Sequence, residues 1–147
     1  MFVFRNYTIE NLYPEETLFS GYGDVSVIPE HETELVWFYQ VPINFDSKAQ
    51  VKEVETLKDK LGLVVANIKS DQTLFVMSLE NIFPLYFADR DRSLDDAVAG
   101  FNGYARELES DHSNIRYIDF SEYLAKYPQK NWMVWRFYFI SQMVFSP

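Results

Sequence analysis

The chain has no cysteine, only two histidines and only five glycines among its 147 residues, and each scarcity excludes a kind of site. Without thiols there are no disulfides, no cysteine nucleophile and no cysteine-ligated zinc. His31 and His112 stand far apart in the sequence, so no local histidine motif for a metal exists. The glycines form neither Gly-x-Gly-x-x-Gly nor a P-loop, so no phosphate-cradling loop is predicted.

Basic residues are also few. Lys and Arg number 13 against 22 Asp and Glu, which gives a net charge of −9. Such a chain repels phosphate backbones and anionic headgroups, so we expect neither nucleic acid nor a membrane surface as partner. The first residues lack the pattern of a signal peptide. The most apolar run, residues 132–145, contains Arg136 and is too short to span a bilayer, so we expect a soluble, cytoplasmic protein.

Apolar runs rich in strand-forming residues predict five strands in one domain over residues 1–147. We expect them at residues 2–5, 24–28, 35–41, 73–79 and 115–119. The run LVWFYQV at 35–41 is continuously apolar, which is typical of a strand covered on both faces. Residues 20–23, Ser-Gly-Tyr-Gly, are expected to form a turn before the second strand.

Helical periodicity marks the segments between these strands. Ser47-x-x-Gln50 matches a capping box at the start of a helix that continues to about Ile68. Ser93 is expected to cap a second long helix, and Ser121 to start a short one that ends before Pro128. Residues 9–19 suit a short helix, although Pro14 weakens that interpretation.

Strands that alternate with helices predict parallel pairing through right-handed crossovers. We therefore expect an α/β fold: a three-layer α/β/α sandwich of the flavodoxin-like type, with a five-stranded, mainly parallel sheet. Ligands of such sheets bind outside the carboxyl ends of the strands. The residues that strand-end geometry places there are Asn6, Thr8, Ser20, Gly21, Gly23, Asn44, Glu80, Asn81 and Asp119.

One catalytic candidate is the motif Asp89-Arg-Asp91. Haloacid-dehalogenase (HAD) phosphotransferases use Asp-x-Asp after a strand, together with a lysine and a downstream acidic pair that holds magnesium. The only close acidic pair here, Asp95-Asp96, follows too soon to be that second motif. The more ordinary interpretation, a solvated loop before a helix, is favoured, and no metal ligands are predicted.

A Ser-His-Asp hydrolase is the other catalytic candidate, with Thr8 or Ser20 as nucleophile. No Gly-Asp-Ser follows the first strand. His112 precedes the fifth strand, at the rim opposite the strand carboxyl ends, and His31 lies in an acidic loop with no nucleophile nearby. Catalysis by these residues alone is therefore not expected.

The order of segments resembles the N-terminal domain of FkbH-like proteins, which carry a HAD-type domain behind it. The resemblance covers essentially the whole chain. It rests on FRNYTIENLYPEETLFSGYGD (4–24), LVWFYQVPINFD (35–46), LFVMSLENIFPLYF (74–87), IRYIDFSEYLAKYP (115–128) and WRFYFISQMVFSP (135–147). It implies an SGNH (GDSL-type) hydrolase-like fold. SGNH hydrolases carry their site residues in separate sequence blocks. Tyr7 or Thr8 stands near the position of the catalytic serine. Gly21 or Gly23 could match the oxyanion glycine, and Asn44 could match the asparagine. The final Asp-x-x-His is absent.

The resemblance implies a non-catalytic recognition or scaffold module. The HAD domain, with its magnesium, would lie downstream of this chain, and no cofactor is expected here. Implied partners are that domain, an acyl carrier protein or a phosphorylated three-carbon substrate, in polyketide or polysaccharide biosynthesis. Two alternatives stay open: an atypical SGNH-type esterase, and a self-association domain. The latter would use the aromatic residues Trp132, Trp135, Phe137, Tyr138 and Phe139.

Overall fold

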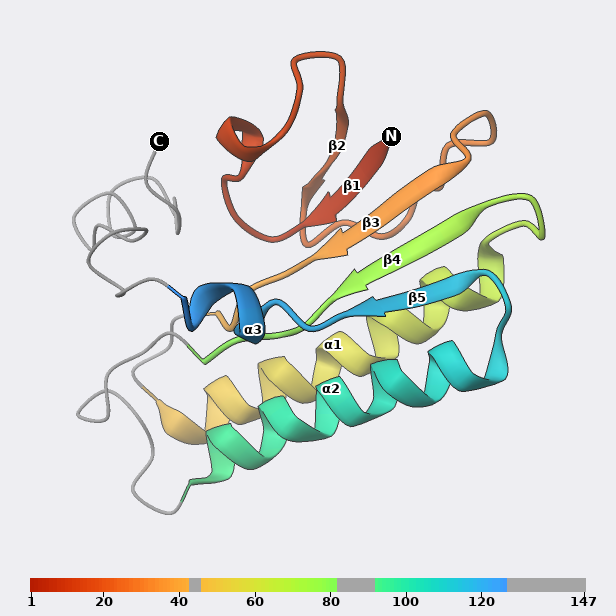
Figure 1. The fold of residues 1–147 in the computed structure, drawn as a ribbon. Helices are drawn as coiled ribbons and strands as arrows, with labels where there is room; N and C mark the ends of the chain where they lie inside the picture. Colours follow the sequence, from red (N-terminus) through yellow and green to blue (C-terminus); the bar gives the residue numbers. More distant parts are fainter. Residues whose placement is uncertain (43–45, 82–91, 127–147) are drawn as a thin grey trace.

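Five parallel strands form the centre of the molecule in the order β2-β1-β3-β4-β5 (Figure 1). The computed structural model describes residues 1–42, 46–81 and 92–126. The strands are β1 (Phe2–Arg5), β2 (Leu18–Tyr22), β3 (Glu34–Phe38), β4 (Thr73–Met77) and β5 (Ile115–Ile118). This order is that of the flavodoxin-like sheets, so the predicted α/β class and parallel pairing are confirmed.

Two long helices, α1 (Ser47–Asn67) and α2 (Ser93–Asp111), pack side by side on one face of the sheet (Figure 1). Among the described residues, the other face carries one 3₁₀ turn, η1 (Glu10–Leu12), and the short helix α3 (Ser121–Leu124). The predicted three layers are therefore present, and in the part of the chain that the structure describes one outer layer is thinner than the other. Both long helices lie on one side because β3, β4 and β5 follow one another across the sheet through crossovers of one hand.

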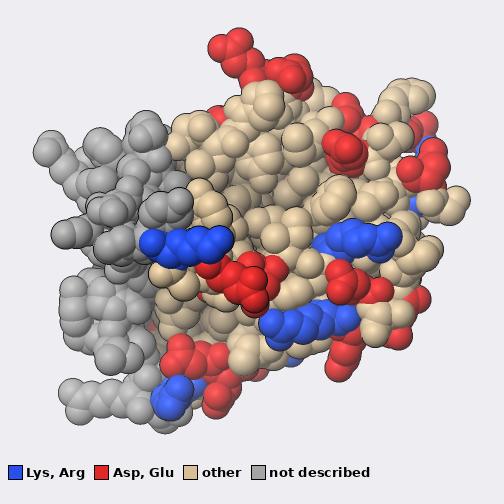
Figure 2. Space-filling view, viewed as in Figure 1, with Lys and Arg blue, Asp and Glu red and all other residues tan. Residues whose placement is uncertain are grey.

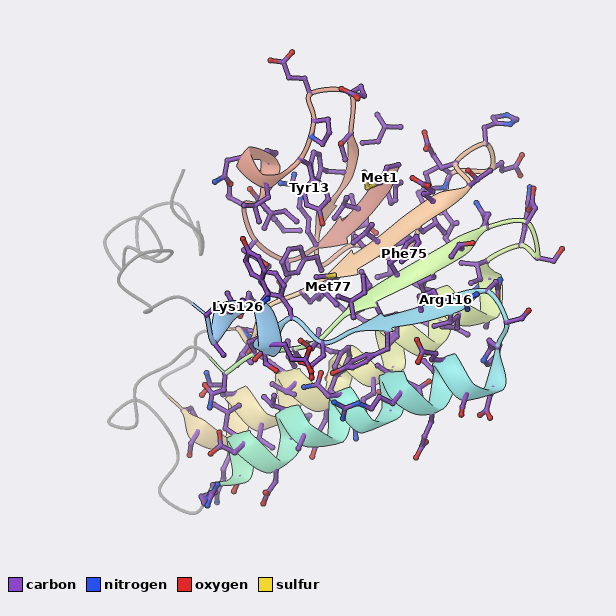
Figure 3. The ribbon with its side chains drawn as sticks, viewed as in Figure 1. Met1, Tyr13, Phe75, Met77, Arg116 and Lys126 are labelled. Atoms are coloured by element: carbon purple, nitrogen blue, oxygen red, sulfur yellow. The ribbon has the colours of Figure 1, made fainter. Side chains whose placement is uncertain are left out.

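Aromatic side chains of β3 form the core on both faces of the sheet. Trp37 is fully buried and stacks toward Phe101 of α2, with 6.3 Å between ring centroids. Its neighbour Phe38 points to the opposite face, where it meets Phe120 edge-on at 5.4 Å. On the next strand, Phe75 and Met77 are half-buried (Figure 3). The continuously apolar run 35–41 thus has the two-sided burial that its composition predicts.

The segment between β1 and β3 differs from the prediction. Residues 9–19 were expected to be helical and 24–28 to form a strand, yet only η1 is helical and the strand is β2. Pro14 ends the helical turn, and the Leu18 amide then bonds to the carbonyl of Met1 at 3.1 Å. The predicted turn at 20–23 is mostly strand for the same reason, since β1 supplies hydrogen bonds that no local pattern reveals.

Helix starts differ from the prediction by one residue. The side chain of Asp46, and not that of Ser47, accepts from the amides of Lys48 and Ala49 at the start of α1. Arg92, with φ of 65°, precedes α2, so Ser93 is its first helical residue and not its cap.

The predicted strands β3, β4 and β5 end one to three residues earlier than expected. Asn44, Asp89-Arg-Asp91 and residues 132–145 lie outside the described residues. Within the described part, no helix is long and apolar enough to cross a membrane.

Candidate functional site

The topological switch point of the sheet lies between β1 and β3. From β1 the chain passes to β2 on one side, and from β3 it passes through α1 to β4 on the other. The two connections separate at the carboxyl ends of these strands, which is where ligands of parallel α/β sheets bind. One residue spans this point. The Asn6 side chain accepts from the Gln40 amide at 2.9 Å and donates to the Gln40 carbonyl at 2.7 Å.

A pocket of about 270 Å³ adjoins this bridge, between the strand ends and the middle turns of α1. The sheet and the loop after β2 contribute Asn6, Tyr39 and Gly23. The rest of the wall is formed by Pro42 and by one face of α1: Glu53, Thr56, Leu57 and Lys60. The spacing of these four residues (i, i+3, i+4 and i+7) is that of a single helix face. The pocket is thus built from elements distant in sequence.

Two polar groups of this pocket have incomplete hydrogen bonding. The hydroxyl of Tyr39 is buried and has no hydrogen-bond partner among the described residues, and only 1% of the residue is exposed. Burial, with a further contribution from the charge of Asp24, raises the pKa of Tyr39, so its hydroxyl stays protonated and can donate. The Lys60 ammonium donates one bond to the Gly23 carbonyl at 2.8 Å. Within the described residues no carboxylate lies within 4.0 Å of it.

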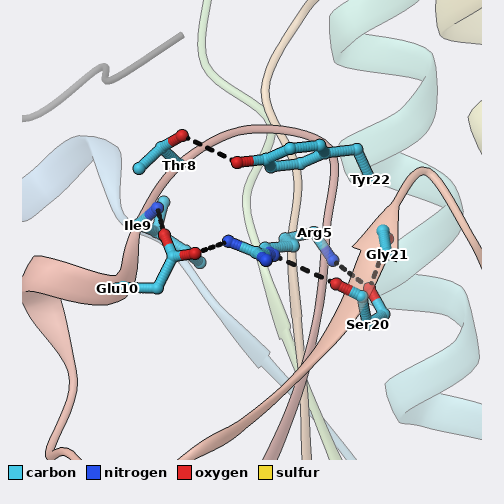
Figure 4. A network of polar contacts seen from close by, with 7 residues as sticks. All are labelled: Arg5, Thr8, Ile9, Glu10, Ser20, Gly21 and Tyr22. Atoms are coloured by element: carbon cyan, nitrogen blue, oxygen red, sulfur yellow. Dashed lines mark hydrogen bonds and ion pairs between the residues drawn. The ribbon is translucent and has the colours of Figure 1, made fainter. Parts of the chain in front are cut away.

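On the other side of β1, Arg5 organises a separate network (Figure 4). Its guanidinium lies over the rings of Phe19 and Tyr22, at 5.0 and 4.6 Å, and pairs with Glu10. Burial opposes ionisation of Glu10, but the hydrogen bond and charge of Arg5 outweigh it, so the pKa of Glu10 is lowered. The cation therefore holds η1 against β2. Its Nε donates to the Ser20 carbonyl and one Nη to Glu10, so the guanidinium links β1, η1 and β2 and has a structural role.

The two candidate nucleophiles lie in this network. The Ser20 hydroxyl accepts from the Arg5 amide at 3.1 Å and donates to the Gly21 carbonyl at 2.8 Å, and the residue is buried. Thr8 shares a hydrogen bond of 2.9 Å with the Tyr22 hydroxyl. His31 and His112 both precede strands and so lie at the amino edge of the sheet, away from these hydroxyls. The geometry offers neither hydroxyl an imidazole base.

A third group of polar residues follows β4 and β5. Ser78 donates to the Glu80 carboxylate and accepts from the Phe120 amide at 2.8 Å, which ties the two strand ends together. Burial and the nearby charge of Asp119 raise the pKa of Glu80. Asp119 in turn lies 3.7 Å from the guanidinium of Arg106. In the described part of the chain, no three acidic or histidine side chains gather as a metal site would require.

The residues that the sequence singled out are divided between these places. Asn6 and Gly23 line the pocket, while Thr8, Ser20 and Gly21 belong to the Arg5 network. Glu80 and Asp119 form the third group. Asn81 donates to Asp95 at 2.8 Å, and Asn44 lies outside the described residues.

Of the pocket residues only Asn6 and Gly23 were suggested by the sequence, and Tyr39 and Lys60 are among those that were not. Tyr39 belongs to the buried run 35–41, and only its place just beyond the end of β3 could have marked it. Lys60 belongs to a helix face that reads as mixed and solvated, because Lys58 and Asp59 adjoin it. Its contact with Gly23 depends on the loop after β2 crossing α1, which is a tertiary relationship.

Comparison with known proteins supports the fold. No protein-family model and no curated protein matches the sequence. One solved structure does match in three dimensions. It is the N-terminal part of the protein BF1531 from Bacteroides fragilis, which contains a phosphatase domain complexed with Mg. The match has a TM-score of 0.71 at 11% sequence identity, and it covers 99% of this chain and 46% of that one. This chain therefore has a fold related to part of the BF1531 structure, and it spans less than half of that structure's length.

Proposed function

We propose that this chain is a non-catalytic recognition module of an FkbH-like, HAD-type phosphatase or glyceryl-transfer protein. The observation that carries the proposal is the separation of the hydroxyls from the imidazoles. Thr8 and Ser20 lie at the carboxyl edge of the sheet, whereas both histidines lie at the amino edge. Acyl transfer by a serine-type mechanism needs a base within hydrogen-bond reach of its nucleophile.

The coverage of the BF1531 match supports a modular arrangement. This chain corresponds to 46% of a structure that contains a phosphatase domain with Mg. In the proposed arrangement the magnesium and the phosphoryl chemistry belong to a second domain, downstream of this one. That domain is then the first partner of this module.

Substrate binding is the role that the pocket favours over docking of an acyl carrier protein. Carrier proteins are generally acidic, and this chain has a net charge of −9. On the face in Figure 2, Lys and Arg side chains lie scattered among Asp and Glu and form no continuous basic patch. The pocket at the switch point, by contrast, is a hollow at the strand ends that is lined by Asn6, Tyr39 and Lys60.

The absence of catalysis is tested with the purified chain, using p-nitrophenyl acetate and, with Mg²⁺ present, p-nitrophenyl phosphate. We expect no hydrolysis above the buffer rate with either compound. Ester hydrolysis that disappears in Thr8→Ala and persists in Ser113→Ala would establish the esterase instead. Ser113 is a suitable control because it is an exposed residue at the amino edge.

The modular arrangement is tested on the natural polypeptide by intact mass and by reading its sequence beyond Pro147. We expect a longer product with an Asp-x-Asp-x-Thr strand end after this domain. A natural polypeptide that ends at Pro147 would contradict the arrangement, because it would contain no downstream phosphatase domain.

A further inference from the structure

We propose that the thinly covered face of the sheet binds the same face of a second copy of this chain, in a two-fold symmetric dimer. The inference goes beyond the proposed function, because it concerns a face of the sheet that takes no part in the pocket. Parallel sheets are normally covered on both faces. Here α1 and α2 cover one face, whereas the described part of the other carries only η1 and α3 (Figure 1).

Apolar side chains on this face stay accessible. In β4, alternate residues are buried under the helices, while Phe75 and Met77 point to the other face and are half-buried (Figure 3). Ile118 of β5 pairs with Met77 and is 39% exposed. The accessible residues that make up this sheet-face patch are Met1, Tyr13, Phe75, Met77, Ile118 and Tyr123.

The two margins of the sheet-face patch carry opposite charges. Figure 2 shows a broad uncharged area over the middle of this face. Along its β5 side lie the exposed Arg116 and Lys126, and Glu122 of α3 leaves this margin basic on balance. On the opposite side, the loop between η1 and β2 carries the exposed Glu15 and Glu16. Within the described part of the chain, none of these residues forms an ion pair.

Margins of opposite charge make the face complementary to itself. Two copies can meet face to face about a two-fold axis that runs along the strands. The β5 margin of each copy then lies over the loop between η1 and β2 of the other. Each dimer thus contains two contacts between opposite charges around an apolar centre, which is the usual composition of a specific interface.

The size of the face indicates a weak and reversible dimer. Five strands spaced about 4.8 Å apart give a face roughly 20 Å wide. Such a face lies at the small end of specific interfaces. We therefore expect a dissociation constant on the order of 50 μM.

The test is sedimentation velocity of the purified chain from about 5 μM to about 500 μM. We expect the sedimentation coefficient to rise over this range from that of a monomer toward that of a dimer. Ile118→Lys should weaken the dimer by about tenfold or more, because it places a charge in the apolar contact. Ile118 is exposed in the single chain, so the variant should stay folded, which circular dichroism checks.

Charge reversal at the margins tests the two-fold arrangement. Arg116→Glu with Lys126→Glu gives a chain with two acidic margins, and Glu15→Lys with Glu16→Lys gives one with two basic margins. Each double variant alone should dimerise about tenfold or more weakly than the wild type, although the second has a smaller net negative charge. An equimolar mixture of the two should form a heterodimer at least as tight as the wild-type dimer.

Lys48→Glu with Lys52→Glu is the matched control, because it changes the net charge as much as the first double variant does. Both residues are exposed on α1, at the other face of the sheet, so dimerisation should stay within about threefold of the wild type.

A chain that stays monomeric up to about 500 μM would overturn the inference and leave the sheet-face patch to the downstream domain. It is also overturned if Ile118→Lys dimerises as the wild type does, or if the two charge-reversed chains do not associate when mixed. None of these outcomes depends on the hydrolase assays or on the length of the natural polypeptide. Esterase activity would refute the non-catalytic role and leave the dimer standing, whereas a monomer would leave the proposed function untouched.

Discussion

Asn6 and Gln40 are joined by two hydrogen bonds that run from one side chain to one backbone. The amide nitrogen of Asn6 donates to the Gln40 carbonyl, and its oxygen accepts from the Gln40 amide. Gln40 is buried, with 2% of the residue exposed. The bridge therefore satisfies, just beyond β1 and β3, two backbone groups that the ladder between these strands no longer reaches.

Removing this bridge should destabilise the protein markedly. We expect Asn6→Ala to lower the free energy of unfolding by about 2–4 kcal/mol, because it leaves a buried N–H and a buried C=O unsatisfied. Urea denaturation gives this value. Asn6→Asp keeps the acceptor but loses the donor, so its free energy of unfolding should lie between those of the wild type and Asn6→Ala. A loss below about 0.5 kcal/mol in Asn6→Ala would show that the bridge does not stabilise the crevice.

The turn after β2 requires a glycine at one position and tolerates alanine two residues earlier. Gly23 has φ of +69°, which other residues adopt at a cost of about 1–2 kcal/mol. At Gly21 a Cβ would meet Asp24 at 3.5 Å, an ordinary contact. We expect Gly23→Ala to lower the unfolding free energy by about 1 kcal/mol and Gly21→Ala to leave it within about 0.5 kcal/mol. Equal losses in thermal melts of the two variants would argue against this conformation.

The start of α1 gives a paired prediction for capping. Asp46 accepts from two amides of the first turn, whereas Ser47 is already helical. Asp46→Ala should cost about 1 kcal/mol, because both amides lose their partner. Ser47→Ala should change the stability by less than about 0.5 kcal/mol. Chemical denaturation of the two variants distinguishes them, and the reverse order would restore Ser47 as the cap.

Glu80 gives a prediction that depends on pH. Burial first, and then repulsion by Asp119, raise its pKa in the folded protein. The folded state thus holds this proton more tightly than the unfolded state. The resulting stabilisation is complete below the ordinary glutamate pKa and is lost as pH rises through the raised pKa. Glu80→Gln should therefore be more stable than the wild type at pH 7.

The advantage of Glu80→Gln should shrink to nearly nothing by about pH 4, where the wild-type carboxyl is also protonated. Urea titrations at the two pH values measure the difference. Glu122→Gln, an exposed residue on α3, is the control for loss of one charge. An advantage that is the same at both pH values would show that titration of Glu80 is not its cause.

The parts of the fold that the sequence predicts are those with strong periodicity or continuous burial. The stripe from Val54 to Val64 identifies α1, and the run 35–41 identifies β3. The segment 9–28 could not be assigned in this way. Leu18 and Phe19 suit either a helix or a strand, and it is pairing with β1 that decides.

The same limit applies to the site. Asn6 is identified by its place after a predicted strand, because strand ends are visible in the pattern. Lys60 is not identified in this way, because its hydrogen-bond partner Gly23 lies 37 residues earlier in the chain. The contact between Lys60 of α1 and the loop after β2 exists only in the assembled fold.

The position of β2 at the sheet margin has a consequence for local opening. Among the described strands β2 has one neighbour, β1, and Leu18 and Tyr22 are largely exposed. A strand bonded on one side separates at a lower free energy than a central one, so its amides exchange with solvent sooner. Gly23 follows β2 directly and its carbonyl holds Lys60, so each opening of this margin also releases the ammonium group.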